Sequence, residues 1–203
     1  MTAVPDDPDD PALIAAKRAL RAELRRRRDA RPAERRGADD RARADVLLTR
    51  LELAGPACIA GYLSAGSEPG TLAIVHRLAG RGFEVLLPAS RDGAWAEPAW
   101  ARYSGPDELQ LGPRAISEPR GDRLPAEAVA RAQVVLCPGL AGTARGERLG
   151  RGGGWYDRVL PLVTGTRVLL LNDDEVLEAL PVGPLDARVD AIVTPTAFRE
   201  CRA

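Results

Sequence analysis

Residues 133–158 read QVVLCPGLAGTARGERLGRGGGWYDR and combine three signals within a short stretch. The first five residues, 133–137, are a short apolar run of the kind that forms a buried strand. Four glycines fall within positions 150–154, and from residue 155 the pattern turns helical, with Tyr156, Val159 and Leu160 able to pack inward. A strand, a glycine-rich loop and a helix in this order are typical of an α/β protein with a parallel sheet.

The glycine-rich loop has the composition of an anion-binding site. Glycines let the backbone approach a ligand closely, and the N-terminus of the following helix presents free N–H groups. Arg148 and Arg151 add formal positive charge. The run matches neither the G-x-x-x-x-G-K-[ST] phosphate loop nor a convincing G-x-G-x-x-G dinucleotide fingerprint. A flexible turn without a ligand is the alternative that this pattern leaves open.

Asp157 follows the glycines at the start of the new helix. A carboxylate beside bound phosphates is a candidate Mg²⁺ ligand, because nucleotide magnesium is held by one or two carboxylates together with phosphate oxygens. The plainer interpretation is an acidic residue that stabilises the first turn of a helix. Asp186 and Asp190 are candidates for a second carboxylate.

The same alternation of strand and helix extends outward along the chain and predicts an α/β fold with a mainly parallel sheet. Residues 94–121 are irregular and include a possible short hairpin or binding loop. In that segment Trp100 either stacks on a ligand or belongs to the core, and we favour the core. The sequence predicts strands at 57–63, 83–88, 133–137, 167–171 and 189–193, and helices at 11–28, 32–53 and 69–80.

The first predicted helix carries the only lysine among the 29 basic residues. Asp10 followed by Pro11 is a favourable helix start. Leucines at positions 13, 20 and 24 form an apolar stripe, and Lys17 lies on it with Arg21 one turn later. Lys17 either extends past the edge of the core or binds an anion together with Arg21. The many charges of the second helix are expected to face solvent.

Composition excludes several classes of protein. The 203 residues, 45% hydrophobic, suit one domain, and the 29 basic and 29 acidic residues cancel, which argues against a nucleic-acid-binding surface. No apolar run is long enough to span a membrane, and the three cysteines, Cys58 and Cys137 among them, suit buried residues rather than a zinc site. The single histidine, His76, is expected on a helix surface, so histidine-driven hydrolysis is disfavoured. We expect a cytoplasmic monomer with a disordered tail at residues 1–10.

Three stretches together resemble the 5-formyltetrahydrofolate cyclo-ligase (methenyltetrahydrofolate synthetase) family. They are the first helix around Lys17, the run from Pro138 to Arg158, and PVGPLDARVDAIVT from Pro181 to Thr194. Further matches are Tyr62-Leu63-Ser64 with Glu68 and Thr71, and Ile116-Ser117-Glu118-Pro119. They occur in the family's order and span almost the whole chain after residue 10. The resemblance implies a single domain, residues 11–203, with a Rossmann-like three-layer fold.

The resemblance implies an ATP- and Mg²⁺-dependent enzyme that closes 5-formyltetrahydrofolate to 5,10-methenyltetrahydrofolate and releases ADP and phosphate. In the family's mechanism ATP phosphorylates the formyl oxygen, N10 attacks the activated carbon, and phosphate leaves. This chemistry needs positioning and charge stabilisation rather than a covalent nucleophile on the protein. The implied partners are therefore small-molecule substrates, without nucleic acid or membrane.

The resemblance also implies roles for individual residues. Arg148 and Arg151 would stabilise charge during catalysis, Asp157 and Asp186 would hold Mg²⁺, and Leu63 and Glu68 would contact the folate. ATP would be bound by Lys17, Arg21, Arg148, Leu149, Gly150, Arg151, Gly152, Gly153, Gly154, Trp155 and Tyr156. The last five of these, residues 152–156, would also contact the folate substrate.

Two positions depart from the family pattern. Gly142-Thr143 stands where the family usually has Phe-Asp, and Leu185 stands where His or Asn commonly precedes Asp186. The first change could weaken the handling of metal or nucleotide, and the second could disturb the orientation of Asp186. The alternatives are therefore a relative that binds nucleotide or folate with little turnover, or one that acts on a different formyl or amide substrate.

Overall fold

The computed structural model of the protein describes residues 10–51, 57–91 and 94–202. The expected tail at residues 1–9 lies outside these ranges, whereas Asp10 lies within them and caps the first helix by accepting a hydrogen bond from Ala12 N at 2.9 Å. None of the described helices combines the length and apolar character that crossing a bilayer requires.

An eight-stranded sheet forms the centre of the fold, in the order β13-β12-β10-β7-β1-β2-β3-β6. The five strands from β12 to β2 pair in parallel, and the strands at both edges run antiparallel. The strands are β1 (Cys58–Ala60), β2 (Glu84–Arg91), β3 (Ala94–Arg102), β6 (Leu124–Pro125), β7 (Val134–Pro138), β10 (Thr166–Leu170), β12 (Ala191–Val193) and β13 (Phe198–Glu200). The expectation of a mainly parallel α/β sheet is thus confirmed.

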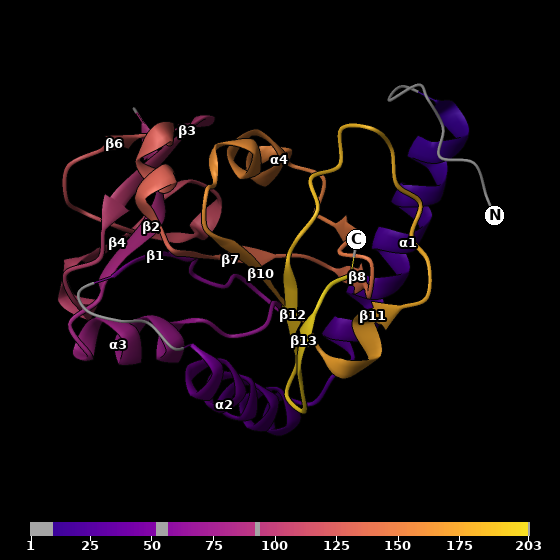
Figure 1. The fold of residues 1–203 in the computed structure, drawn as a ribbon, viewed down its shortest axis with the longest axis horizontal. Coiled ribbons are helices and arrows are strands. Elements are labelled where there is room, and N and C mark those ends of the chain that lie inside the picture. Colours follow the sequence, from indigo (N-terminus) through magenta and orange to yellow (C-terminus); the bar gives the residue numbers. More distant parts are fainter. Residues whose placement is uncertain (1–9, 52–56, 92–93, 203) are drawn as a thin grey trace.

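Helices cover both faces of this sheet. In Figure 1, α2 (Ala33–Arg50) and α3 (Leu72–Gly80) lie below the sheet, and α4 (Trp155–Val159) lies above it. All three begin close to their predicted positions, although α2 ends at Arg50 rather than near residue 53 and α4 has only five residues. The result is the expected three-layer arrangement.

The first helix, α1 (Pro11–Asp29), does not lie over the large sheet. It packs against a small sheet made of β11 (Val176–Leu177), β8 (Ala141–Thr143) and β9 (Arg148–Leu149), at the right of Figure 1. A separate apolar cluster of Leu24, Leu140, Ala141, Leu149 and Leu180 joins the two. The helix is therefore held beside the glycine-rich loop.

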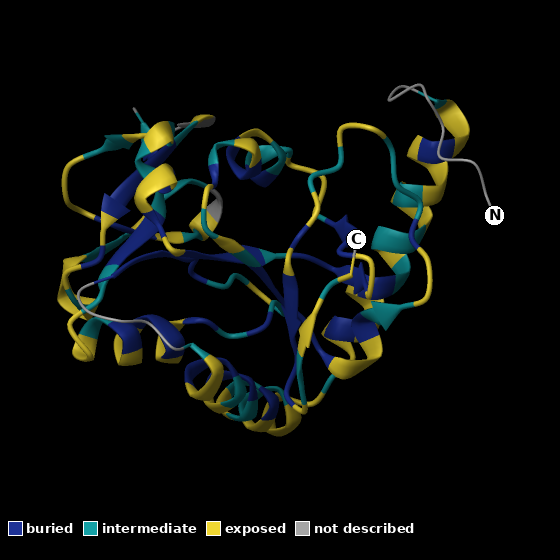
Figure 2. Cartoon of the chain, viewed as in Figure 1, coloured by how far each residue is buried: buried dark blue, intermediate teal, exposed yellow. Residues whose placement is uncertain are grey.

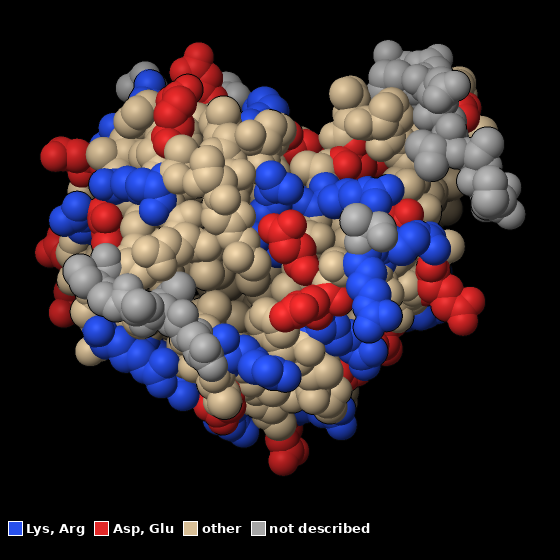
Figure 3. All heavy atoms as spheres, in the orientation of Figure 1, with Lys and Arg blue, Asp and Glu red and all other residues tan. Residues whose placement is uncertain are grey.

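The main core surrounds the central strands, which are dark blue in Figure 2. Trp100 is fully buried and its Nε1 donates to Ala126 O at 3.2 Å, so its interpretation as a core residue is confirmed. Cys58 and Cys137 are buried as expected, and His76 is exposed on α3. On the face shown in Figure 3, basic and acidic side chains are interspersed.

The structure departs from the local expectations at three places. Residues 94–121 are more regular than expected, because β3 extends the sheet. The short hairpin that the sequence left open in this segment is present, since β4 (Leu109–Leu111) pairs with β5 (Ser117–Pro119). A further edge strand, β13, follows the last predicted strand. On α2, Asp39 and Arg43 are buried rather than solvated, because Arg43 donates to Leu171 O and Asn172 Oδ1 below the sheet.

Candidate active site

A cleft of about 420 Å³ lies at the carboxyl ends of β1, β2 and β7. The chain leaves β1 toward β2 on one side, while β7 continues toward β10 on the other, so the cleft marks the point where the strand order reverses. Open α/β sheets bind their ligands at such points. The lining residues are Arg25, Tyr62, Leu63, Ala65, Glu68, Pro88, Ile116, Ser117, Pro138, Arg148 and residues 150–157.

The glycine-rich loop forms one wall of this cleft. Gly152 and Gly154 have φ angles of 96° and 64°, a backbone conformation that residues with a side chain rarely adopt. The helix that follows, α4, is too short for a substantial dipole, and no side chain caps it. Attraction of an anion to the loop must therefore come from the arginines around it, with less help from the helix than the sequence indicates.

Arg148 lies beneath the loop with its guanidinium almost fully buried. It donates to Pro138 O at 3.2 Å and forms an ion pair with Asp157, which is 38% exposed toward the cleft. This ion pair links β9, which carries Arg148, to the first turn of α4, which carries Asp157. Both side chains therefore lie where the sequence interpretation expected them, but each neutralises the other in this structure.

Two arginines of α1 extend toward the same loop. Arg21 Nε donates to Gly150 O at 2.9 Å, and Arg25 Nη2 donates to Arg151 O at 2.7 Å. Burial lowers the pKa of Arg21 and so does the neighbouring Arg25, whereas Asp186 and Asp157 act in the opposite direction. Arg21 is therefore within electrostatic reach of both acidic residues expected to hold metal.

Lys17 lies one turn before Arg21 on α1, and its Nζ is 2.5 Å from Asp186 Oδ2. Lys17, Arg21 and Asp186 do not line the cleft itself. Arg21 is nevertheless close to the loop, because a Cβ atom at Gly152 would lie 3.6 Å from its guanidinium carbon. These residues form an extension beside the cleft. Arg25, which does line the cleft, was missed from the sequence although its spacing of four from Arg21 places it on the same helix face.

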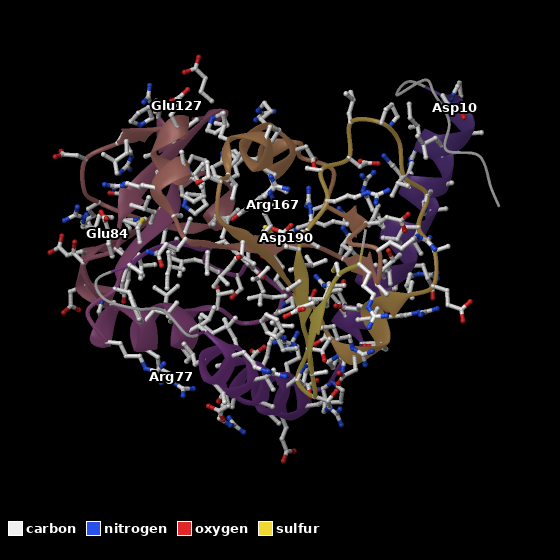
Figure 4. The ribbon with its side chains drawn as sticks, in the orientation of Figure 1. Asp10, Arg77, Glu84, Glu127, Arg167 and Asp190 are labelled. Atoms are coloured by element: carbon white, nitrogen blue, oxygen red, sulfur yellow. The ribbon has the colours of Figure 1, made fainter. Side chains whose placement is uncertain are left out.

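Of the two candidates for a second carboxylate, only Asp186 lies near the loop. Asp190 accepts a hydrogen bond from Arg167 N at 2.7 Å at the amino end of β10, the opposite end of the strands from the cleft. Figure 4 labels Arg167 and Asp190 side by side at this end. Asp190 therefore serves the pairing of β10 with β12.

Leu63 and Glu68 lie on the segment after β1, across the cleft from the glycine-rich loop. Glu68 accepts from Ala65 N at 2.8 Å, and its other oxygen pairs with Arg151 at 2.8 Å. This ion pair bridges the two walls of the cleft. Burial raises the pKa of Tyr62 and of Tyr156, so both phenols stay neutral in the floor of the cleft.

Three of the residues assigned to ATP or substrate are anchored in the apolar clusters of the fold. Leu149 is buried against α1, so only its backbone is available to a ligand. Trp155 and Tyr156 line the cleft, and the Trp155 ring contacts buried Trp100 edge-on at 5.0 Å. The aromatic wall is thus anchored in the core.

The two departures from the family pattern do not touch the cleft. Thr143 is buried and donates to Glu147 Oε2 at 2.9 Å within the turn between β8 and β9. Leu185 is 73% exposed, and Asp186 is oriented instead by Gly183 N, which donates to Asp186 Oδ2 at 2.6 Å. Neither position removes a group from the site.

Comparison with known proteins agrees with this geometry. The family model for the 5-formyltetrahydrofolate cyclo-ligase family matches residues 13–195. The chain belongs to this family. A 5-formyltetrahydrofolate cyclo-ligase of Mycolicibacterium smegmatis is 36% identical over 177 residues, covering 85% of this chain and 89% of the relative. That of Escherichia coli is 28% identical over 180 residues, covering 87% and 99%.

Solved structures of cyclo-ligase relatives have the same fold. The NMR structure of the Aquifex aeolicus 5,10-methenyltetrahydrofolate synthetase superposes with a TM-score of 0.79 at 28% identity, covering 92% of this chain and 93% of that one. The Mycoplasma pneumoniae synthetase, at 18% identity and a TM-score of 0.69, covers 88% and 98% and shares the fold. The three-layer architecture is therefore that of the cyclo-ligase family.

Proposed function

We propose that the protein catalyses the ATP-dependent conversion of 5-formyltetrahydrofolate to 5,10-methenyltetrahydrofolate, with release of ADP and phosphate. The observation that carries this proposal is the convergence of a glycine-rich loop, Arg25 and Arg148 on a single cleft at the switch point of the sheet. Its volume of about 420 Å³ is within the range of small-molecule sites. Membership of the cyclo-ligase family supports the substrates.

The reaction needs no nucleophile from the protein. The formyl oxygen attacks the γ-phosphorus of ATP, and ADP leaves. N10 then attacks the formyl carbon and loses its proton. The bond between this carbon and the phosphorylated oxygen breaks, and phosphate leaves with the electron pair. The protein's part is to align the two substrates and to stabilise the charge that moves between phosphates. Lys17, Arg21, Arg148 and Arg151 would bind the phosphates, with the amides of residues 149–156.

The folate would occupy the other side of the cleft. Leu63 offers an apolar surface and Glu68 a carboxylate that already bridges to Arg151, the proposed contact with phosphate. Trp155 and Tyr156 would border both substrates. The ion pair between Glu68 and Arg151 thus couples the position of the folate wall to that of the nucleotide loop.

Mg²⁺ is part of the proposal, and the chemistry of the donors fits it. Among the described residues no three His, Cys, Asp or Glu side chains gather as a metal site, so the ion would depend on phosphate oxygens as well as protein. Asp157 and Asp186 supply hard carboxylate oxygens, and both lie close enough to Arg21 to act on it electrostatically. A bound Mg²⁺ would neutralise charge on the phosphates.

We also propose that residues 11–203 act as one cytoplasmic, monomeric domain with only small-molecule substrates. The large apolar side chains exposed among the described residues belong to separate segments, namely Ile14, Leu72, Leu111 and Leu185. Such isolated residues do not call for a partner surface. Sedimentation equilibrium tests this, and a dimer at micromolar concentration would contradict it.

The decisive experiment is a spectroscopic assay. Purified protein is mixed with 5-formyltetrahydrofolate, Mg²⁺ and ATP, and the absorbance of the methenyl product is followed against a reaction without ATP. We expect product only when ATP is present, with one ADP for each methenyl group. A folded protein that binds ATP and forms no product would refute the proposal.

A further inference from the structure

Glu118 holds the β4–β5 hairpin to the end of β2. Its carboxylate is buried and accepts hydrogen bonds from Ser90 N at 2.7 Å, Ser90 Oγ at 2.9 Å, Gln110 Nε2 at 3.2 Å and Arg123 Nη2 at 2.9 Å. Arg123 in turn donates to Ser90 O at 2.8 Å. The hairpin lies against β2 and β3, at the left of Figure 1.

Every neighbour that hydrogen-bonds to this carboxylate is a donor. Only an ionised carboxylate, which accepts and does not donate, satisfies all of them at once. A glutamine of the same shape would turn an NH₂ group toward donors. The network therefore depends on the charge of Glu118 and not merely on the volume of its side chain.

The backbone around Glu118 is arranged to meet it. The pairing of β2 with β3 is interrupted between Ala89 and Arg91, and the N–H of Ser90, at this interruption, donates to Glu118. Ala115, in the hairpin turn, has a φ of 56° and is the one residue other than glycine with positive φ in the described ranges. Such strain persists where surrounding contacts fix the backbone, and it is concentrated at functional sites.

The hairpin so held forms a wall of the cleft. Ile116 and Ser117 line it directly before Glu118, and Pro88 lines it two residues before Ser90. The cations proposed to bind phosphates come from α1, β9 and the glycine-rich loop instead. A shift of the hairpin would therefore alter the part of the cleft beside the folate and leave the phosphate contacts in place.

We propose that Glu118 is a positioning residue for the folate substrate, because it fixes Ile116 and Ser117 as a wall of the cleft. This proposal rests on the proposed cyclo-ligase activity. It assigns a role to the hairpin within residues 94–121. The residue acts through the hairpin and does not itself touch the substrate.

The test compares Glu118→Gln with a matched variant, Glu147→Gln. Glu147 is also a buried glutamate, but it pairs with Thr143 and Arg145 outside the cleft. We expect Glu118→Gln to raise the KM for 5-formyltetrahydrofolate roughly 5- to 10-fold, as loss of one or two hydrogen-bonded contacts would. The KM for ATP should change less than about twofold, and Glu147→Gln should leave both KM values unchanged.

A second variant, Ser90→Ala, covers the case in which Glu118→Gln fails to fold. It removes one donor and leaves the carboxylate with its other partners, so the KM for the folate should rise only about two- to threefold. Hydrogen exchange at residues 109–119 should be faster in both variants than in wild type.

The outcomes separate this proposal from the proposed function. If wild-type protein forms no methenyl product, the proposed function fails and the folate role of Glu118 fails with it. If wild type is active but the folded Glu118 and Ser90 variants keep the wild-type KM for folate, only the positioning role is overturned. Equal rises in both KM values would overturn it as well, because they would indicate general loosening of the structure.

Discussion

Lys17 Nζ and Asp186 Oδ2 lie 2.5 Å apart although 169 residues separate them in the sequence. Arg148 and Asp157 form a second pair of the same kind nearby. In each pair a cation proposed to bind phosphate neutralises a carboxylate proposed to bind Mg²⁺. We therefore expect both ion pairs to open when MgATP binds. Lys17 and Arg148 would then pair with phosphate oxygens, and Asp186 and Asp157 would be available to hold Mg²⁺.

The first prediction concerns Lys17. Lys17→Ala should lower kcat/KM for ATP about 100-fold, because a fixed positive charge at the transferred phosphate is lost. The unfolding free energy should change by only about 1 kcal/mol, because the pair with Asp186 is partly exposed. Steady-state kinetics and urea unfolding measure the two effects. Arg18→Ala, on the exposed face of α1, is the control, and near-normal turnover by Lys17→Ala would exclude the phosphate role.

The second prediction concerns Asp157. Asp157→Asn keeps the shape of the side chain but loses the charge that attracts Mg²⁺, so half-maximal activity should require about tenfold more Mg²⁺. Titrating activity with Mg²⁺ at saturating ATP measures this. The same titration on Asp190→Asn is the control, because Asp190 lies at the other end of the strands. Identical curves for Asp157→Asn and wild type would contradict a metal role.

The sequence predicts the central strands and the cleft because their signals are local. The apolar runs that become β1, β7 and β10 are short and bounded by turns. The glycine-rich loop, which comes after β7 and the β8–β9 hairpin, has a composition that indicates a ligand. The placement of Lys17 beside Asp186 could not be derived from spacing, because α1 packs on the small sheet through contacts distant in sequence.

Other features escaped prediction for physical reasons. β3 contains a proline and alternates poorly, yet pairing with β2 over most of its length forms a strand. Arg28 and Arg43 belong to arginine-rich runs, in which the sequence does not show which arginine is buried. Both are buried and hydrogen-bonded to specific partners. A charge that is buried and paired cannot be distinguished by sequence from one that faces solvent.

The third prediction concerns the buried pair that anchors α1. Arg28 donates to both oxygens of Glu175, at 2.6 and 2.7 Å, and also to Gly139 O. Glu175→Ala leaves the guanidinium buried without its partner, so the unfolding free energy should fall by about 3–5 kcal/mol. Urea unfolding followed by circular dichroism measures this. Glu178→Ala is the control, because Glu178 is an exposed glutamate directly after β11. A similarly small change in both variants would contradict the prediction.

The last prediction concerns stability at alkaline pH. Burial raises the pKa of the Cys137 thiol from 9.0 to about 12. Between these values the unfolded chain releases a proton that the folded chain keeps, so unfolding becomes easier as pH rises. This contribution is present below pH 9, and roughly 1 kcal/mol of it is lost by pH 10.

Urea unfolding of wild type and Cys137→Ala at pH 8 and pH 10, in reducing buffer, tests this sign. Cys137→Ala will itself change stability by leaving a small cavity, but that change is the same at both pH values. Other buried groups, such as Cys58 with its pKa raised to about 11, titrate alike in both proteins and cancel. The variant should therefore lose roughly 1 kcal/mol less than wild type between the two pH values. Equal losses would mean that the thiol of Cys137 ionises in the folded protein as readily as in the unfolded chain.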